Sequence, residues 1–291
     1  MTKTAWIFPG QGSQVVGMGI DLKEMPSSKD KFEQAEQILG WSILEKCQGD
    51  ETELSRTLYT QPCLYVIESI LTDLLQDKGQ QPDLVAGHSL GEYSALYAAG
   101  VFDFESGLRL VKRRAELMDI ADGGKMAALM KFDREKLETA IAATPDVVLA
   151  NDNSAEQVVI SGTPEAVDAI VSQVKAKRTV PLKLSGAFHS PFMANAAREF
   201  QKELDAISFN DARVPVLSNA EPKPATVAAE LKQRLIAQMT GNVRWREIML
   251  QLPAVGISLA IEVGPGKVLT GLLKRTCPEL TLKNVHSLSD F

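Results

Sequence analysis

The sequence predicts an α/β fold in which a larger domain with a mainly parallel sheet carries a small inserted domain. Short apolar runs such as Thr4–Phe8 and Leu84–Gly87 alternate with helical segments, and this alternation is typical of a parallel sheet with helices on both faces. Between Lys125 and Ser185 the pattern changes to short strands paired through turns. A length of 291 residues is enough for one large domain with an insertion.

The larger domain is expected to comprise residues 1–124 and 186–291. Its first strand, Thr4–Phe8, is ended by the Gly-rich turn Pro9–Gln14, which brings backbone amides to one edge of the sheet. The turn lacks the Lys and Ser/Thr of a phosphate-binding loop. The other elements are expected as strands at 84–87, 214–218 and 258–263 and as helices at 60–78, 92–99, 103–118, 191–205, 225–239, 245–250 and 268–275.

The inserted domain is expected to comprise residues 125–185. Its elements are predicted as strands at 126–130, 147–150, 157–161 and 179–184 and as helices at 133–143 and 163–176, with Asp133 as an N-cap and a polar turn at 151–156. The order β-α-β-β-α-β is that of a ferredoxin-like split βαβ motif.

Composition excludes several classes of protein. Hydrophobic residues make up 45% of the chain and charged residues 23%, as in ordinary globular proteins, and the net charge of −6 disfavours nucleic-acid binding. No apolar run approaches the roughly 20 residues that cross a bilayer, and the N-terminus does not resemble a signal peptide. Three widely spaced cysteines indicate a reducing compartment and no metal site. We therefore expect a cytoplasmic protein that binds neither membrane nor nucleic acid.

The pentapeptide Gly87-His88-Ser89-Leu90-Gly91 lies between a predicted strand and a predicted helix. A G-x-S-x-G segment in this position places a serine hydroxyl on a sharp turn, and the two glycines avoid the clashes that side chains would make there. The helix N-terminus that follows offers free N–H groups to an oxyanion. The pattern indicates a serine nucleophile, Ser89, in an α/β-hydrolase-like domain.

A serine nucleophile needs a base, and the chain has three histidines. His88 is expected to pack beneath the turn, and His286 lies near an exposed C-terminus. His189 lies where the chain leaves the inserted domain, which makes it the best candidate. Spacing alone leaves open whether a carboxylate or a neutral carbonyl orients this histidine; the candidate carboxylates are Asp205, Asp211, Glu221 and Glu262.

Four motifs together carry a family resemblance that runs essentially end to end. They are Phe8-Pro9-Gly10-Gln11-Gly12-Ser13-Gln14, Gly87-His88-Ser89-Leu90-Gly91-Glu92-Tyr93, Ala187-Phe188-His189-Ser190 and Glu262-Val263-Gly264-Pro265-Gly266-Lys267-Val268-Leu269. In this order they resemble the malonyl-CoA:acyl carrier protein transacylases of bacterial-type fatty acid synthesis.

The resemblance implies ping-pong acyl transfer. Ser89 would attack the malonyl thioester with His189 as base, and the phosphopantetheine thiol of holo acyl carrier protein would then take the malonyl group. The family's oxyanion hole corresponds here to the backbone amides of Gln11 and Leu90. No cofactor is implied, since malonyl-CoA is a substrate, and a monomer is expected.

The resemblance also implies substrate-binding and orienting residues. Arg114 would pair with the malonyl carboxylate, although its neighbour Arg113 leaves a one-residue ambiguity. Gln238 would supply the carbonyl that orients the histidine, in a loop that departs from the family pattern. Asn153 matches an asparagine that lines the cleft, and Phe188 matches a position that accompanies unbranched malonyl units.

Three alternatives remain beside this interpretation. One is a stand-alone acyltransferase that serves a polyketide synthase with the same chemistry and another carrier. Another is a serine esterase or thioesterase, which would more typically show a carboxylate-oriented histidine and no buried arginine. The third is a non-catalytic carrier-binding module.

Overall fold

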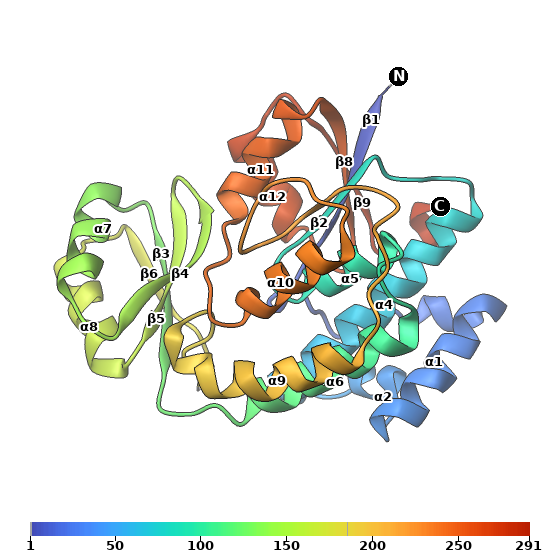
Figure 1. Cartoon of the computed structure of the whole chain (residues 1–291), viewed down its shortest axis with the longest axis horizontal. Coiled ribbons are helices and arrows are strands. Elements are labelled where there is room, and N and C mark those ends of the chain that lie inside the picture. Colours follow the sequence, from blue (N-terminus) through green and yellow to red (C-terminus); the bar gives the residue numbers. More distant parts are fainter. Residues whose placement is uncertain (1, 185) are drawn as a thin grey trace.

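The structure is a computed structural model, and it describes residues 2–184 and 186–291. Met1 and Ser185, which fall within the two predicted domain ranges, lie outside the described residues. Two sheets occur in the described part of the chain, each with its own helices (Figure 1). The larger sheet contains the first and the last strand along the chain, and the smaller one is built from a single central segment.

The strands and helices have the following bounds. The strands are β1 (Lys3–Phe8), β2 (Leu84–Gly87), β3 (Lys125–Met130), β4 (Val147–Ser154), β5 (Gln157–Gly162), β6 (Arg178–Pro181), β7 (Val216–Leu217), β8 (Ile257–Val263) and β9 (Thr281–Val285). The helices are α1 (Pro26–Leu39), α2 (Ile43–Gln48), α3 (Glu51–Leu54), α4 (Thr57–Asp77), α5 (Gly91–Ala98), α6 (Phe104–Asp119), α7 (Arg134–Ala143), α8 (Pro164–Gln173), α9 (Ala194–Ala206), α10 (Ala228–Gln238), α11 (Trp245–Ala254) and α12 (Val268–Thr276).

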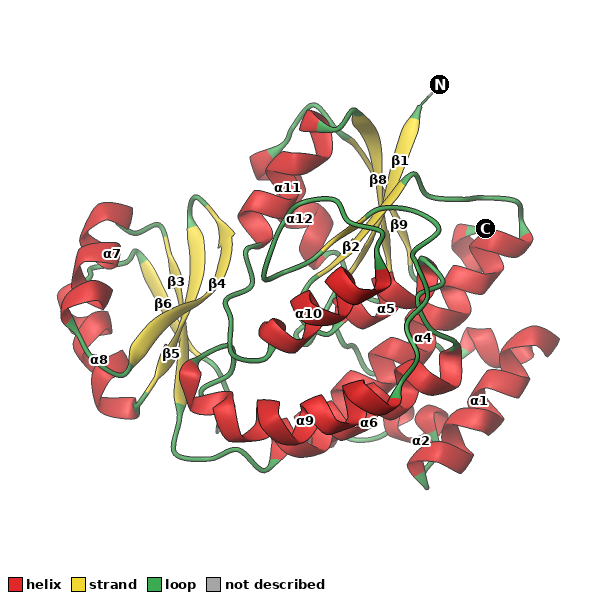
Figure 2. Cartoon of the chain, in the orientation of Figure 1, coloured by secondary structure: helices red, strands yellow, loops and turns green. Residues whose placement is uncertain are grey.

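The larger sheet is parallel, as predicted, with strand order β7-β2-β1-β8-β9. Successive side chains of β1 point to opposite faces. Trp6 and Phe8 enter the core on the side of α4, α5 and α6, whereas Ala5 and Ile7 enter the core beneath α11 and α12. Figure 2 shows these helix layers on the two sides of the sheet. Both faces are therefore covered, which explains why β1 and β2 read as continuous apolar runs.

The smaller sheet is antiparallel, with strand order β4-β5-β3-β6. This is the order of a ferredoxin-like sheet, and its helices α7 and α8 cover one face through a core that includes Leu129, Ile160 and Val167. On the opposite face, Met126, Ala128 and Val159 line a cavity shared with the larger sheet's unit. The smaller sheet thus forms one wall of that cavity.

The prediction of a turn at 151–156 is wrong at its N-terminal end, because β4 continues through Ser154. The polar end of this strand pairs with β5 on one side and with Val243, outside the sheet, on the other. Val243 donates its N–H to the carbonyl of Ala150 (2.8 Å) and accepts from the N–H of Asp152 (2.9 Å). Residues 151–154 are polar, and a run of polar residues is typical of a turn when its distant partners are not known.

Helices α1 to α3 and strand β9 were not among the predicted elements. Strand β9 is largely polar and lies at the sheet edge beside β8, so it lacks the apolar run that marks a buried strand. No helix in residues 2–184 and 186–291 is long and apolar enough to span a membrane.

Candidate active site

Ser89 lies on a sharp turn between the end of β2 and the start of α5. Its φ of +52° is in the left-handed region, which few residues other than glycine adopt. A Cβ at Gly87 would overlap the backbone of Gly91, and one at Gly91 would overlap the carbonyl group of Phe8. Only glycine therefore fits at these two positions, and the predicted turn geometry is present.

His189 is the histidine that contacts this serine. Its Nε2 lies 2.7 Å from Ser89 Oγ, and its Nδ1 lies 3.0 Å from the carbonyl oxygen of Gln238 and 3.2 Å from that of Gly241. Since carbonyls only accept, Nδ1 carries the proton and Nε2 is free to accept one from the serine. Among the described residues, the orienting groups are thus neutral carbonyls at the C-terminal end of α10 rather than a carboxylate.

The four candidate carboxylates have other partners. Asp205 pairs with Lys232 and Glu221 with Arg234, while Asp211 accepts a hydrogen bond from the N–H of Ala228. Glu262 accepts from the N–H groups at the start of α12.

The imidazole of His189 is neutral at ordinary pH. Burial, and then the positive charge of Arg114, lower the pKa of His189 to about 3, although the carbonyls of Gln238 and Gly241 oppose this shift. A neutral imidazole is the form that can take the proton of Ser89. The predicted base is therefore in its proton-accepting form.

Arg114 lies on α6 with no exposed surface, and its Nη2 is 3.0 Å from Ser89 Oγ. The same nitrogen lies 3.2 Å from Gln238 Oε1, and Nη1 donates to Gln61 Oε1 at 2.8 Å. No carboxylate of the described residues forms an ion pair with this guanidinium. Arg113 faces away from the site and pairs with Glu116 on the helix surface (3.3 Å). Of the two neighbouring arginines, only Arg114 reaches the nucleophile.

Two backbone N–H groups beside the nucleophile are free. Gly10, in the first Gly-rich turn, lies so close to the elbow that a Cβ there would overlap the carbonyl oxygen of His88. Within residues 2–184 and 186–291, the N–H groups of Gln11 and Leu90 donate to no other group. Free amides at a turn and at the first turn of a helix are the donors that an oxyanion needs.

His88 adjoins the elbow, and its ring packs against the buried side chain of Trp245. His88 is half-buried on the cavity wall, where its Nε2 lies 2.8 Å from Asn153 Oδ1 and its ring meets that of Trp245 edge-on at 5.5 Å. Strand β4 approaches the elbow at this point. Asn153 thus borders the cavity through a contact with the elbow.

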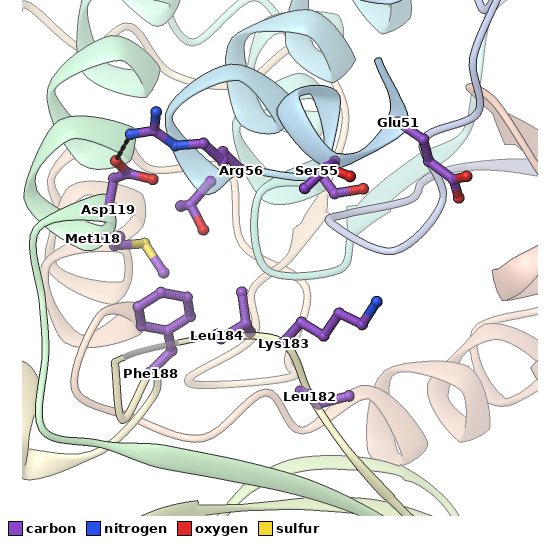
Figure 3. A pocket seen from close by; sticks show the side chains of 11 residues that line it. Glu51, Ser55, Arg56, Met118, Asp119, Leu182, Lys183, Leu184 and Phe188 are labelled. Atoms are coloured by element: carbon purple, nitrogen blue, oxygen red, sulfur yellow. Dashed lines mark hydrogen bonds and ion pairs between the residues drawn. The ribbon is translucent and has the colours of Figure 1, made fainter.

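Seven of the eight predicted site residues line one cavity of about 300 Å³: Gln11, Ser89, Leu90, Arg114, Asn153, Phe188 and His189. Gln238 is buried behind it and contacts Arg114 and the elbow backbone. A second cavity of about 700 Å³ adjoins the first, since Met118, Leu184 and Phe188 line both. Figure 3 shows Leu184 and Phe188 across the cavity from the ion pair of Arg56 and Asp119 (2.7 Å), with Met118 beside Asp119. The two cavities therefore share part of their walls.

Two buried residues near the nucleophile escaped the sequence analysis, Asn219 and Glu92. Asn219 accepts a hydrogen bond from the N–H of Ser89 (2.7 Å), and Glu92 accepts from Gln238 Nε2 (2.7 Å). Burial raises the pKa of Glu92 to about 7. Glu92 lies in the motif Gly87–Tyr93 that the sequence analysis quoted. Asn219 lies 130 residues after Ser89, and no local sequence pattern marks it.

Comparison with known proteins assigns the chain to a family. The acyl transferase domain family matches residues 5–289. A curated malonyl CoA-acyl carrier protein transacylase from Synechocystis is 65% identical over 288 residues, covering 99% of this chain and 98% of the relative. The chain belongs to the malonyl-CoA:acyl carrier protein transacylase family. It is therefore an acyltransferase.

Solved structures agree with this assignment. The crystal structure of the Synechocystis transacylase superposes with a TM-score of 0.98 at 64% identity, covering 99% of this chain and 98% of that one. A type II PKS acyl-carrier protein in complex with its malonyl-transacylase matches at a TM-score of 0.93 and 37% identity, covering 99% and 97%. The α/β fold with its two sheets is thus that of the family. In the described part of this chain, no group of three or more His, Cys, Asp and Glu side chains could hold a metal ion.

Proposed function

We propose that the protein transfers the malonyl group of malonyl-CoA to the phosphopantetheine thiol of acyl carrier protein through a malonyl ester of Ser89. One observation supports malonyl as the acyl group. A fully buried guanidinium without an ion-pair partner lies 3.0 Å from the nucleophile. Glu92 interacts with this charge without forming an ion pair, and because burying an incompletely paired charge is costly, the site favours an anion from outside. The free carboxylate of a malonyl thioester supplies one beside the reacting carbonyl.

The acylation step follows from the contacts of Ser89. Its Oγ attacks the thioester carbonyl while His189 Nε2 takes the hydroxyl proton, and the N–H groups of Gln11 and Leu90 donate to the oxyanion of the tetrahedral intermediate. When the intermediate collapses, the C–S bond breaks and the CoA sulfur leaves with the proton held by His189. Malonyl-Ser89 and free CoA result.

The second half-reaction reverses these roles. The phosphopantetheine thiol of the carrier gives its proton to His189 as its sulfur attacks the ester carbonyl of malonyl-Ser89. Collapse of the second intermediate breaks the bond to Ser89 Oγ, which recovers the proton from His189. No step consumes an oxidant, a metal or another cofactor, and we propose that the protein uses none.

Phe188 is proposed to favour unbranched malonyl units. Its side chain is buried and lines the cavity beside His189. A ring at this position would crowd an α-methyl group, so malonyl-CoA should be turned over faster than methylmalonyl-CoA. Equal rates for the two thioesters would refute this role.

We further propose a cytoplasmic monomer that supplies fatty acid synthesis, with the domain division 1–124 and 186–291 against 125–185. Three buried, free cysteines support a reducing compartment. The 65% identical relative carries no polyketide designation in its name, which favours fatty acid synthesis over a polyketide pathway. The carbonyl-oriented histidine and the buried Arg114 argue against an esterase.

One labelling experiment tests the proposed function. The protein is incubated with radiolabelled malonyl-CoA, with and without holo acyl carrier protein, then digested, and the labelled residue is located. The expected result is label on Ser89 that moves to the carrier when the carrier is present, and near-complete loss of label in Ser89→Ala. Label that passes to water instead of the carrier would indicate a thioesterase.

A further inference from the structure

Asn219 holds the two consecutive peptide groups that lead into the nucleophile. Its Oδ1 accepts a hydrogen bond from the N–H of Ser89 (2.7 Å), and its Nδ2 donates one to the carbonyl oxygen of Gly87 (2.6 Å). The side chain has no exposed surface. It therefore bridges the last residue of β2 and the serine itself.

The position of Asn219 in the sheet explains this bridge. Strand β7 pairs with β2 only as far as Leu217, which lies opposite Ala86. Beyond that point the elbow turns out of the sheet, and backbone pairing ends. The amide of Asn219 supplies the acceptor and the donor that a continuing strand would have supplied to Gly87 and Ser89.

Asn219 is itself fixed by groups of the site. Its N–H donates to Glu92 Oε2 at 3.1 Å, and the same oxygen accepts from Gln238 Nε2 at 2.7 Å. Gln238 Nε2 also donates to the carbonyl oxygen of Ser89 at 2.9 Å. The N–H of Ser89 is thus held by Asn219 and its C=O by Gln238, on either side of the left-handed residue.

This arrangement matters because the conformation of Ser89 is unfavourable by itself. A non-glycine residue in a sparsely populated backbone region costs roughly 1–3 kcal/mol and persists only where its surroundings enforce it. The hydrogen bond to Asn219 also occupies the N–H of Ser89, so the oxyanion must be bound by other amides, among which that of Leu90 is free.

We propose that Asn219 is a positioning residue of the active site, which holds the nucleophile turn so that Ser89 Oγ points at His189. It does not touch the reacting atoms. The inference rests on the elbow and its contacts, and it holds for any acyl donor that Ser89 attacks.

The test compares Asn219→Ala and Asn219→Asp with Ser218→Ala as the matched control. Ser218 is the preceding residue and is equally buried, and its hydroxyl interacts with the carboxylate of Glu92 rather than with Gly87 or Ser89. The measurements are kcat and KM for malonyl transfer, the rate of inactivation by a fluorophosphonate probe of serine nucleophiles, and thermal melting. Since the probe needs Ser89 and His189 but no malonyl group, it tests Asn219 even if the proposed function fails.

We expect Asn219→Ala to lower kcat and the probe rate together by about 10- to 100-fold, because a small misplacement of a nucleophile has effects of this size. KM should stay within about threefold, and Ser218→Ala should keep both rates within about twofold. Asn219→Asp keeps the acceptor for Ser89 but can donate to Gly87 only when the new carboxyl group is protonated. Its kcat relative to the unmodified protein should therefore rise as the pH falls.

Two results would overturn the proposal. One is a wild-type kcat and probe rate in both Asn219 variants. The other is an equal loss of both rates in Ser218→Ala, which would reduce Asn219 to general packing. If Asn219→Ala fails to fold, the pH dependence of Asn219→Asp tests the proposal instead. A purely structural role predicts that the kcat of this variant, divided by the kcat of the unmodified protein, does not change with pH.

Discussion

Replacing Arg114 by alanine should remove the preference for a carboxylate-bearing acyl group. The guanidinium is fully buried, its hydrogen-bond acceptors are neutral side chains, and no other Lys or Arg is among the described residues that line the cavity of Ser89. The space left by the side chain is lined by polar atoms of Gln61 and Gln238, which water can occupy. The variant should therefore fold.

The size of the effect follows from the burial of the pair. Two unit charges about 4 Å apart interact by about 4 kcal/mol at an effective dielectric constant of 20. Truncating one partner of a buried, hydrogen-bonded charge pair costs about 2–5 kcal/mol. At 1.4 kcal/mol per factor of ten, we expect kcat/KM for malonyl-CoA to fall by roughly 30- to 3,000-fold.

The assay measures kcat/KM for malonyl-CoA and acetyl-CoA with the same acyl carrier protein. Acetyl transfer involves no carboxylate, so its kcat/KM should fall much less than that of malonyl transfer. The ratio of kcat/KM for malonyl-CoA to kcat/KM for acetyl-CoA should therefore be much lower in the variant than in the unmodified protein. Arg113→Ala is the control, because Arg113 is adjacent but pairs with Glu116 at the surface; it should stay within about twofold.

Two results would refute this reasoning. If malonyl transfer in Arg114→Ala stays within threefold of the unmodified protein, Arg114 does not bind the carboxylate. If malonyl and acetyl transfer fall by the same factor, Arg114 acts on Ser89 or His189 and not on the acyl group.

Two further predictions concern pH and backbone. Because the folded pKa of His189 is lowered to about 3, the base stays unprotonated above about pH 4, and His189 should add no limb to kcat/KM near pH 6.5. Glu92, with a pKa of about 7, is the site group that can titrate there, so a limb near pH 6.5 that persists in Glu92→Gln would contradict the assignment. The same shift means that stability falls as the pH drops below the usual histidine pKa of about 6.5, so profiles between pH 5 and 8 need a parallel melting control. Gly91→Ala should abolish labelling of Ser89, since its Cβ would overlap the carbonyl of Phe8, whereas Gly79→Ala, with open space around its Cβ but a φ of +75°, should cost only modest stability; normal labelling in Gly91→Ala would show that the elbow can shift.

Local patterns account for what the sequence could predict. The elbow is encoded within five residues by two glycines that no other residue can replace. The ferredoxin-like segment is encoded by the order of its elements, and Asp133 and Thr163 cap their helices as their positions suggest. These features require no knowledge of remote contacts.

Features that depend on remote contacts could not be predicted. Asn219 reaches the elbow only because β7 lies beside β2, and no local sequence pattern predicts that pairing. The carbonyls that orient His189 belong to the last turn of α10 and the loop after it, where helix geometry leaves acceptors unpaired, so no side-chain pattern marks them. The predicted strand at 147–150 is shorter than β4 because the polar residues at the end of β4 bond to partners far along the chain, such as Val243 and Arg246.

Arg114 and His189 constrain each other in a way that suits the proposed reaction. A cation close to the base disfavours the imidazolium that must form when Ser89 gives up its proton. A malonyl carboxylate paired with Arg114 offsets that charge, so the imidazolium becomes less costly only once a carboxylate-bearing substrate is bound. An acetyl group brings no such negative charge to the cation. Selectivity should therefore appear in the rate of acylation of Ser89 as well as in binding, and single-turnover rates at saturating malonyl-CoA and acetyl-CoA should differ even when both thioesters occupy the site fully.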